Sequence, residues 1–120
     1  MKQKIIVSTA SITDTKLRLE ISEPLQGLKP GGQILVDSEQ YSFVYLMEDK
    51  DDYTYIVIPE HTWLEIKTAL DTSLSVWLTG PDQSIELVNF QDELDYIISN
   101  IKGNSNYGND MVAKVEEIFN

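Results

Sequence analysis

The alternation of apolar and polar residues in the first half of the chain predicts a series of short β-strands. The clearest is Lys16–Ile21, where every second residue is apolar and the residues between are charged, as in a strand with one buried face. We also expect strands at Lys2–Ser8 and Gln33–Val36. The segment Lys29–Gly32 contains one proline and two glycines, so it is predicted to be a loop.

Two runs rich in aromatic and β-branched residues follow, Tyr41–Met47 and Tyr53–Ile58. They flank the acidic segment Glu48–Asp52, and two such runs around a short polar segment predict an antiparallel hairpin. Both runs place apolar residues on both faces. We therefore expect the hairpin to be central in its sheet and covered on two sides.

A helix is predicted after the hairpin. Pro59 ends the second strand, and a stripe of apolar residues at helical spacing continues to about Leu70. Pro59 suits the first turn of this helix. Alternatively, Thr62 with Glu65 three residues later is the pattern of a capping box, which would begin the helix further in.

The last part of the chain predicts two strands and then two helices. The strands are Leu74–Leu78 and Ser84–Val88, and the helices are Gln91–Lys102 and Asp110–Phe119, each with an apolar stripe. The loop Asn104–Asn109 joins the two helices. Strands followed by helices predict the α+β class, with a largely antiparallel β-sheet of about six to seven short strands, one inserted helix and two C-terminal helices.

The length and composition of the chain narrow its organisation. A chain of 120 residues is expected to form a single domain, residues 1–120. The longest unbroken apolar run is Phe43–Met47, which is too short to span a membrane. The sequence contains no cysteine, so disulfides and thiolate metal sites are excluded. We expect a cytoplasmic protein.

The charge of the chain restricts the class of partner. Lys and Arg number 9 against 20 Asp and Glu, which gives a formal net charge of −11. Direct nucleic-acid binding and anionic membranes are disfavoured, because both depend on clustered basic residues. A basic protein partner or mimicry of nucleic acid remains open, and so does the interpretation that the acidic residues only keep the protein in solution.

Few residues indicate catalytic or metal chemistry. His61 is the single histidine, and near a helix start it is imaginable as a general base, although a surface histidine is the simpler interpretation. The segment Glu48–Asp52 carries four carboxylates but lacks the spacing of a calcium-binding loop, so we expect a solvated turn. No catalytic residue, cofactor or metal site is predicted.

The connection between the last two helices is the predicted interaction surface. Its asparagines can simply build the turn, because asparagine accepts a positive φ angle. Tyr107 lies on this turn and either plugs back onto the domain or anchors a partner. We expect Asn104, Asn106 and Tyr107 to contribute to an interaction surface.

Several segments together resemble a known protein family. They are Ile34–Ser38, Ser42–Tyr45, the pair Ile58 and Pro59 with Trp63, the loop Asn100–Gly108 and the closing Val115–Phe119. The sequence is similar in these segments to the YjbL-like UPF family, small uncharacterised proteins of Bacillales. The resemblance implies no activity, cofactor or catalytic residue.

Two classes of function follow from the sequence. The first is a small acidic cytosolic protein that acts as a non-catalytic protein-interaction or regulatory module with a protein partner. The alternative is a hydrolase or transferase that uses carboxylates, either alone or with a bound metal. This alternative stays open because 20 acidic residues offer many carboxylate pairs. A pocket with converging carboxylates favours the enzyme, and an exposed apolar patch favours the interaction module.

Overall fold

The computed structural model describes residues 3–50 and 52–119, which form two four-stranded β-sheets and three α-helices. The first sheet has the strand order β1-β6-β5-β4. Its β5–β6 and β4–β5 pairs are antiparallel, and its β1–β6 pair is parallel. Its strands are β1 (Gln3–Ile6), β4 (Lys29–Asp37), β5 (Ser42–Asp49) and β6 (Asp52–Pro59).

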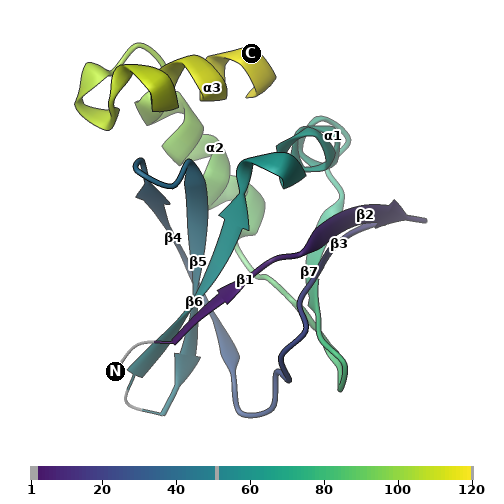
Figure 1. The fold of residues 1–120 in the computed structure, drawn as a ribbon. Coiled ribbons are helices and arrows are strands. Elements are labelled where there is room, and N and C mark those ends of the chain that lie inside the picture. Colours follow the sequence, from purple (N-terminus) through teal and green to yellow (C-terminus); the bar gives the residue numbers. More distant parts are fainter. Residues whose placement is uncertain (1–2, 51, 120) are drawn as a thin grey trace.

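The second sheet has the strand order β2-β3-β7-β8. Its β2–β3 and β7–β8 pairs are antiparallel, and its β3–β7 pair is parallel. Strands β1 and β2 are consecutive in the chain but belong to different sheets, which Figure 1 shows spreading apart from their junction. The strands of the second sheet are β2 (Thr9–Thr13), β3 (Lys16–Glu20), β7 (Ser75–Thr79) and β8 (Ser84–Glu86).

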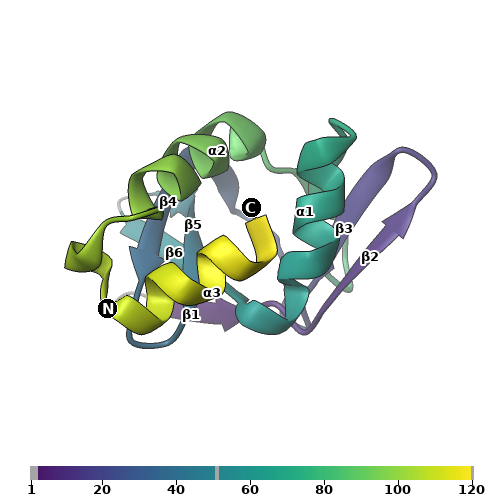
Figure 2. The same ribbon diagram turned by 90° about the horizontal axis from the view of Figure 1, so that it is seen from above.

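The helices gather at one end of the sheets. Seen from above in Figure 2, α3 crosses the end of the first sheet, α2 lies on its far side and α1 lies beside the second sheet. Two short 3-10 helices precede α1 and α3. The helical elements are η1 (Glu60–Thr62), α1 (Trp63–Asp71), α2 (Phe90–Ile101), η2 (Ser105–Tyr107) and α3 (Asn109–Phe119).

One hydrophobic core joins both sheets to the helices. Trp63 at the start of α1 is fully buried, and its ring centroid lies 4.8 Å from that of Phe43 on β5 and 5.7 Å from that of Phe119 on α3. Such ring pairs add about 0.5–1.5 kcal/mol each beyond the burial of their area. A single cluster of three aromatic residues therefore holds an inserted helix, a central strand and the C-terminal helix together.

The α+β class, the inserted helix, the two C-terminal helices and the antiparallel hairpin are confirmed. The described residues contain eight strands in two sheets rather than about six to seven in one. The additional strand is β2, whose residues lack the strong alternation that marks β3. None of the described helices is long and apolar enough to cross a membrane.

Two local predictions are wrong, one of them only in part. Lys29–Gly32 belongs to β4 rather than to a loop, and the register of β4 against β5 shifts between Pro30 and Ile34. A bulge of this kind accommodates the glycines without ending the strand. The alternative start at Thr62 is confirmed in position, because Thr62 is the N-cap residue of α1, which begins at Trp63. Its capping hydrogen bond does not form, because the Thr62 hydroxyl donates instead to the carbonyl oxygen of Pro59, 2.7 Å away.

The expectation that the hairpin is covered on both sides holds only in part, because all residues from Ser42 to Met47 on β5 are buried but Tyr55 and Val57 on β6 are half-buried. Strands β5 and β6 are central in the first sheet, as expected. Figure 1 shows α2 and α3 beside and above this sheet, whereas none of the described helices lies over its left-hand face. The sheet therefore has an inner face toward the core and an outer face without a helix.

Candidate functional site

The outer face of the first sheet is apolar across all four strands. The register aligns Ile6 with Val57, Val57 with Val44, and Val44 with Leu35, so that one apolar residue from each strand forms a continuous row. Ile6 is 62 % exposed and Leu35 39 % exposed, at the two ends of this row. A row of this kind is unusual for a solvated face, which is normally polar at alternate positions.

A second row lies next to the first on the same face. Lys4, Tyr55 and Leu46 are aligned across β1, β6 and β5. Val44 and Leu46 on β5 are buried by their neighbours, although neither belongs to the core cluster. We use the name outer face for the apolar residues of the two rows, Ile6, Leu35, Val44, Leu46, Tyr55 and Val57.

A groove of about 350 Å³ lies over the β4 side of the outer face. Its apolar lining consists of Leu35, Val36, Val44, Tyr55 and Val57. Polar residues complete the lining, and these are Lys4 on β1, Asp37 on β4, and Ser38 and Glu39 in the turn that follows β4. The groove thus combines an apolar base with two carboxylates and one ammonium group.

Two glycines allow the backbone of β4 to pass close to β5. A Cβ atom on Gly31 would lie 2.6 Å from the carbonyl oxygen of Leu46, so a glycine is required for this close approach. Gly32 follows with a φ angle of +74°, which other residues rarely adopt. Its amide donates to the hydroxyl of Tyr45, which in turn donates to the carbonyl oxygen of Val88, at 3.1 and 2.7 Å.

Among the described residues, two side chains have shifted pKa values, and both form hydrogen bonds that hold the fold together. Burial raises the pKa of the Tyr45 phenol to about 12, an effect that the hydrogen bond from Gly32 partly offsets. The backbone amide of Leu25 donates to the Asp82 carboxylate at 2.9 Å and holds the pKa of that carboxyl below its ordinary value of 3.8. Asp82 thereby ties the turn after β7 to the segment after β3.

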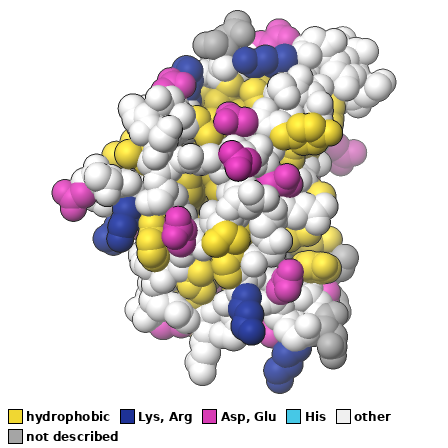
Figure 3. All heavy atoms as spheres, turned by 180° about the vertical axis from the view of Figure 1, so that it is seen from behind, with side chains coloured by type: hydrophobic (Ala, Val, Ile, Leu, Met, Phe, Trp, Pro, Cys, Tyr) yellow, Lys and Arg dark blue, Asp and Glu magenta, His cyan; other side chains and the backbone are white. Residues whose placement is uncertain are grey.

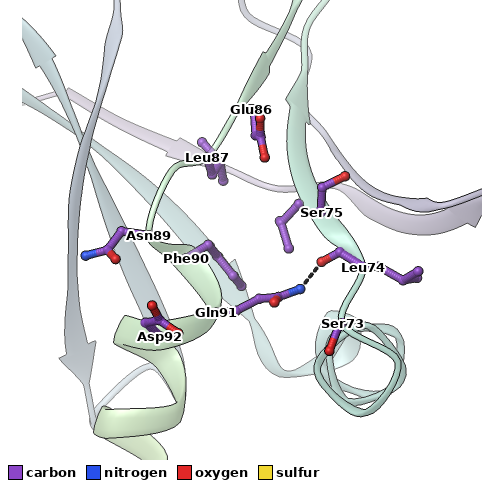
Figure 4. Close-up of a pocket in the computed structure, with 10 residues that line it drawn as sticks. Ser73, Leu74, Ser75, Glu86, Leu87, Asn89, Phe90, Gln91 and Asp92 are labelled. Carbon is purple, nitrogen blue, oxygen red and sulfur yellow. Dashed lines mark hydrogen bonds between the residues drawn. The ribbon is translucent and has the colours of Figure 1, made fainter.

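A second pocket, of about 320 Å³, lies between β7, β8 and the start of α2 (Figure 4). The side-chain amide of Gln91 reaches across it and donates to the carbonyl oxygen of Leu74. Its two carboxylates, Glu86 and Asp92, lie at opposite ends of the pocket in Figure 4. This arrangement does not direct them to one reacting atom, as paired carboxylate catalysis requires.

His61 lies beside the junction of β1 and β2. Its Nε2 atom donates to the carbonyl oxygen of Ser8, 2.9 Å away, and the side chain is exposed. Ser8 is separated from His61 by 53 positions in the sequence, so this contact was not predictable from local pattern. The bond satisfies a backbone carbonyl at the point where the chain leaves the first sheet for the second.

The acidic segment forms the tip of the hairpin. Glu48 and Asp49 end β5, Asp52 begins β6, and Asp51 lies outside the described residues. Over residues 3–50 and 52–119, no three His, Cys, Asp or Glu side chains come close enough together to hold a metal ion.

Two residues of the predicted interaction loop stabilise the fold itself. The Asn104 side chain accepts from the amide of Asn106 at 3.0 Å and caps η2, as a turn-building asparagine does. Tyr107 is half-buried and packs against the core, whereas Asn106 is exposed. Whether these residues contact a partner stays a prediction.

The loop and the groove lie at the same end of the molecule. Figures 1 and 2 both place the η2 loop near the end of β4 that leads into the β4–β5 turn. Tyr41 in this turn donates from its hydroxyl to Asp110 of α3 at 3.4 Å, and the Lys114 ammonium lies 4.8 Å from the centre of its ring. These contacts connect the loop region to the turn beside the groove.

The outer face was missed as a site although its signal was present. Apolar residues on both faces of Tyr41–Met47 and Tyr53–Ile58 indicated two apolar surfaces. The sequence does not say which surface a helix covers, because that depends on where distant segments return. The candidate functional site is therefore the outer face with its groove.

The comparisons with known proteins concern the whole chain. The model of a family described as a family of unknown function (UPF0738) matches residues 5–119. The chain is 42 % identical to a UPF0738 protein of Bacillus velezensis and 42 % identical to the UPF0738 protein YjbL of Bacillus subtilis, in each case over 99 % of both chains. It is 34 % identical to a UPF0738 protein of Staphylococcus epidermidis, over 97 % of this chain and 96 % of the relative. No solved structure gives a significant match. The chain belongs to the UPF0738 family.

Proposed function

We propose that this protein is a non-catalytic protein-interaction module of the cytoplasm that binds a protein partner through its outer face. The observation that carries the proposal is the apolar row Ile6, Val57, Val44 and Leu35, one residue from each strand of the first sheet, in which Ile6 and Leu35 are exposed, Val57 is half-buried and Val44 is buried. Contiguous apolar surface outside the core is a feature of binding sites rather than of ordinary protein surface.

The energy of burial supports this use of the face. Covering an exposed valine, leucine or isoleucine side chain contributes about 1.5–3 kcal/mol when burial is complete. Ile6 and Leu35 keep 62 % and 39 % of their surface exposed, so a partner that covers them recovers part of this energy. Polar groups around the row, such as Lys4 and Asp37, give the face the polar rim that interfaces have.

The η2 loop is proposed as an extension of the same interface. This loop, which contains Asn104, Asn106 and Tyr107, lies near the end of β4 that leads into the β4–β5 turn (Figures 1 and 2), and Ser38 and Glu39 of that turn line the groove. Replacing Tyr107 with alanine is expected to weaken the partner contact by about 2 kcal/mol if the ring contacts the partner. Loss of folding without an effect on partner binding would instead make Tyr107 a structural plug, and the loop would leave the interface.

The test of the proposed function compares two apolar-to-acidic substitutions. Leu35→Asp places a charge in the outer face, and Leu64→Asp places the same charge on α1, where Leu64 is 65 % exposed. Tagged wild-type protein and both variants are purified from the host cell, and bound proteins are identified by mass spectrometry. Circular dichroism first establishes that both variants are folded.

We expect the wild type and Leu64→Asp to retain the same partner and Leu35→Asp to lose it. Recovery of that partner by Leu35→Asp at the wild-type level would contradict the proposal. Loss of the partner in Leu64→Asp alone would also contradict it, because the interface would then lie on α1.

A further inference from the structure

We infer that the outer face binds a short, basic, amphipathic helical segment of its partner, with apolar side chains in the groove and Lys or Arg beside Asp37 and Glu39. This inference rests on the proposed interaction function and specifies the chemistry of the partner. Three observations support it: the shape of the groove, the charges at the groove and the size of the outer face.

The shape of the groove suits a few apolar side chains. Its volume of about 350 Å³ is lined on the apolar side by residues of three adjacent strands, Leu35, Val36, Val44, Tyr55 and Val57. Recognition therefore takes place on the face rather than by adding a strand to an edge. A helix laid across such a face presents apolar residues at positions i, i+3, i+4 and i+7, which is a common way for peptides to bind a groove.

The charges at the groove favour a basic segment. Neither Asp37 nor Glu39 forms an ion pair with a lysine or arginine in the part of the chain that the structure describes. The Asp37 carboxylate accepts from the backbone amide of Gln40 at 3.2 Å, and Glu39 is exposed. Lys4 is the single cation among the residues that line the groove. Two carboxylates against one ammonium group attract a cationic partner.

The charge of the whole molecule acts in the same direction. The net charge of −11 attracts basic segments over distances of about 8 Å at physiological ionic strength. Figure 3 shows acidic side chains spread among apolar ones on the side of the molecule turned away in Figure 1. The electrostatic attraction is therefore general, and the groove supplies the apolar contact that localises a basic segment.

A second copy of this chain fits the face less well than a segment does. Four strands about 4.8 Å apart, each with two or three outward-facing residues spaced about 6.7 Å along the strand, give a flat footprint on the order of 300 Å². A stable interface between whole proteins buries about 800 Å² on each partner. A second copy would also bring a further net charge of −11 to the contact. The footprint and the charge both favour a short basic segment.

The experiment titrates synthetic peptides into ¹⁵N-labelled protein and follows the backbone amides by NMR. The probe is a peptide of about 18 residues, or five helical turns, with leucine along one stripe and lysine on both flanks. A matched peptide carries glutamate in place of every lysine. The protein variants are Leu35→Asp, the double variant Asp37→Asn/Glu39→Gln, and the control Asp92→Asn/Asp95→Asn on α2, which removes the same number of negative charges.

We expect the lysine peptide to shift amides of β4, β5 and β6 and the glutamate peptide to leave them unchanged. Asp37→Asn/Glu39→Gln should weaken binding by at least about fivefold, and Asp92→Asn/Asp95→Asn by less than about twofold, because only the first pair lies at the groove. Leu35→Asp should abolish the shifts, and raising the salt from about 50 to 300 mM should weaken binding.

Three results would overturn the inference. They are equal binding of the lysine and glutamate peptides, equal weakening by the two charge-removing double variants, and a dimer in sedimentation that Leu35→Asp dissociates. Absence of lysine-peptide binding, together with loss of the cellular partner in Leu35→Asp, would refute the basic segment while leaving the proposed function standing. Absence of both effects would refute the proposed function itself.

Discussion

At the scale of single residues, Tyr45 joins three parts of the molecule. Its hydroxyl accepts from Gly32 in the β4 bulge and donates to Val88 in the segment before α2. Its ring lies 6.0 Å from that of Phe90 at the start of α2. The side chain is buried, and these two hydrogen bonds satisfy the donor and an acceptor of its hydroxyl.

Replacing Tyr45 with phenylalanine is expected to lower the free energy of unfolding by about 1–3 kcal/mol, because the amide of Gly32 and the carbonyl of Val88 lose their partner. Urea denaturation monitored by circular dichroism measures the change. The fold should remain, since the ring and its packing are kept. An unchanged free energy of unfolding would show that water replaces the hydroxyl.

The raised pKa of Tyr45 also predicts an alkaline limit to stability. The phenol has a pKa of about 12 in the folded protein and 10.0 ordinarily. Its contribution to stability is therefore complete below pH 10 and is lost as the pH rises toward 12, because the unfolded chain releases the proton first. Denaturation midpoints between these pH values should fall more for the wild type than for Tyr45→Phe. Parallel decreases in both proteins would contradict the assignment.

His61→Ala is expected to lower stability by less than about 1 kcal/mol, because the lost hydrogen bond to Ser8 is exposed and water can replace it. Thermal unfolding measures the change, and partner binding should be retained. Loss of partner binding in a folded His61→Ala variant would give the histidine a role that the account does not include.

At the scale of elements, local pattern predicted those segments whose contacts are near in sequence. The hairpin β5–β6 and the helices α2 and α3 follow from alternation and apolar stripes. The parallel pairs β1–β6 and β3–β7 join segments about 50 to 60 residues apart, which no local pattern encodes. The assignment of β1 and β2 to different sheets depends on those pairs, so the division into two sheets could not be predicted.

The β4 bulge also could not be predicted from local pattern, because it depends on the close approach of Gly31 to β5. A substitution at Gly31 tests this close approach. Gly31→Ala should lower the free energy of unfolding by about 1–3 kcal/mol, because the new Cβ meets the carbonyl oxygen of Leu46. Gly103→Ala is the matched control, since its Cβ meets no atom within 4 Å and only its φ angle of +71° is unfavourable. It should cost about 1 kcal/mol. A smaller effect of Gly31→Ala than of the control, in chemical denaturation, would contradict the close approach.

At the scale of the whole molecule, the two apolar surfaces of the first sheet have different surroundings. The inner surface, which includes Phe43, Tyr45 and Met47, belongs to the core that both sheets share with the helices. The outer surface, which includes Leu35, Val44 and Val57, lies outside that core. In the proposed function, the net charge of −11 supplies a general attraction for basic segments, and the outer face supplies the defined contact.

The most direct test of this account is photo-crosslinking in the living host. A photoreactive phenylalanine analogue is placed at position 35 on the outer face and, in a matched control, at position 64 on α1. An adduct of one defined mass is expected from position 35, and none of that mass from position 64. The same adduct from both positions, or from position 64 alone, would contradict the claim that the outer face is the binding surface.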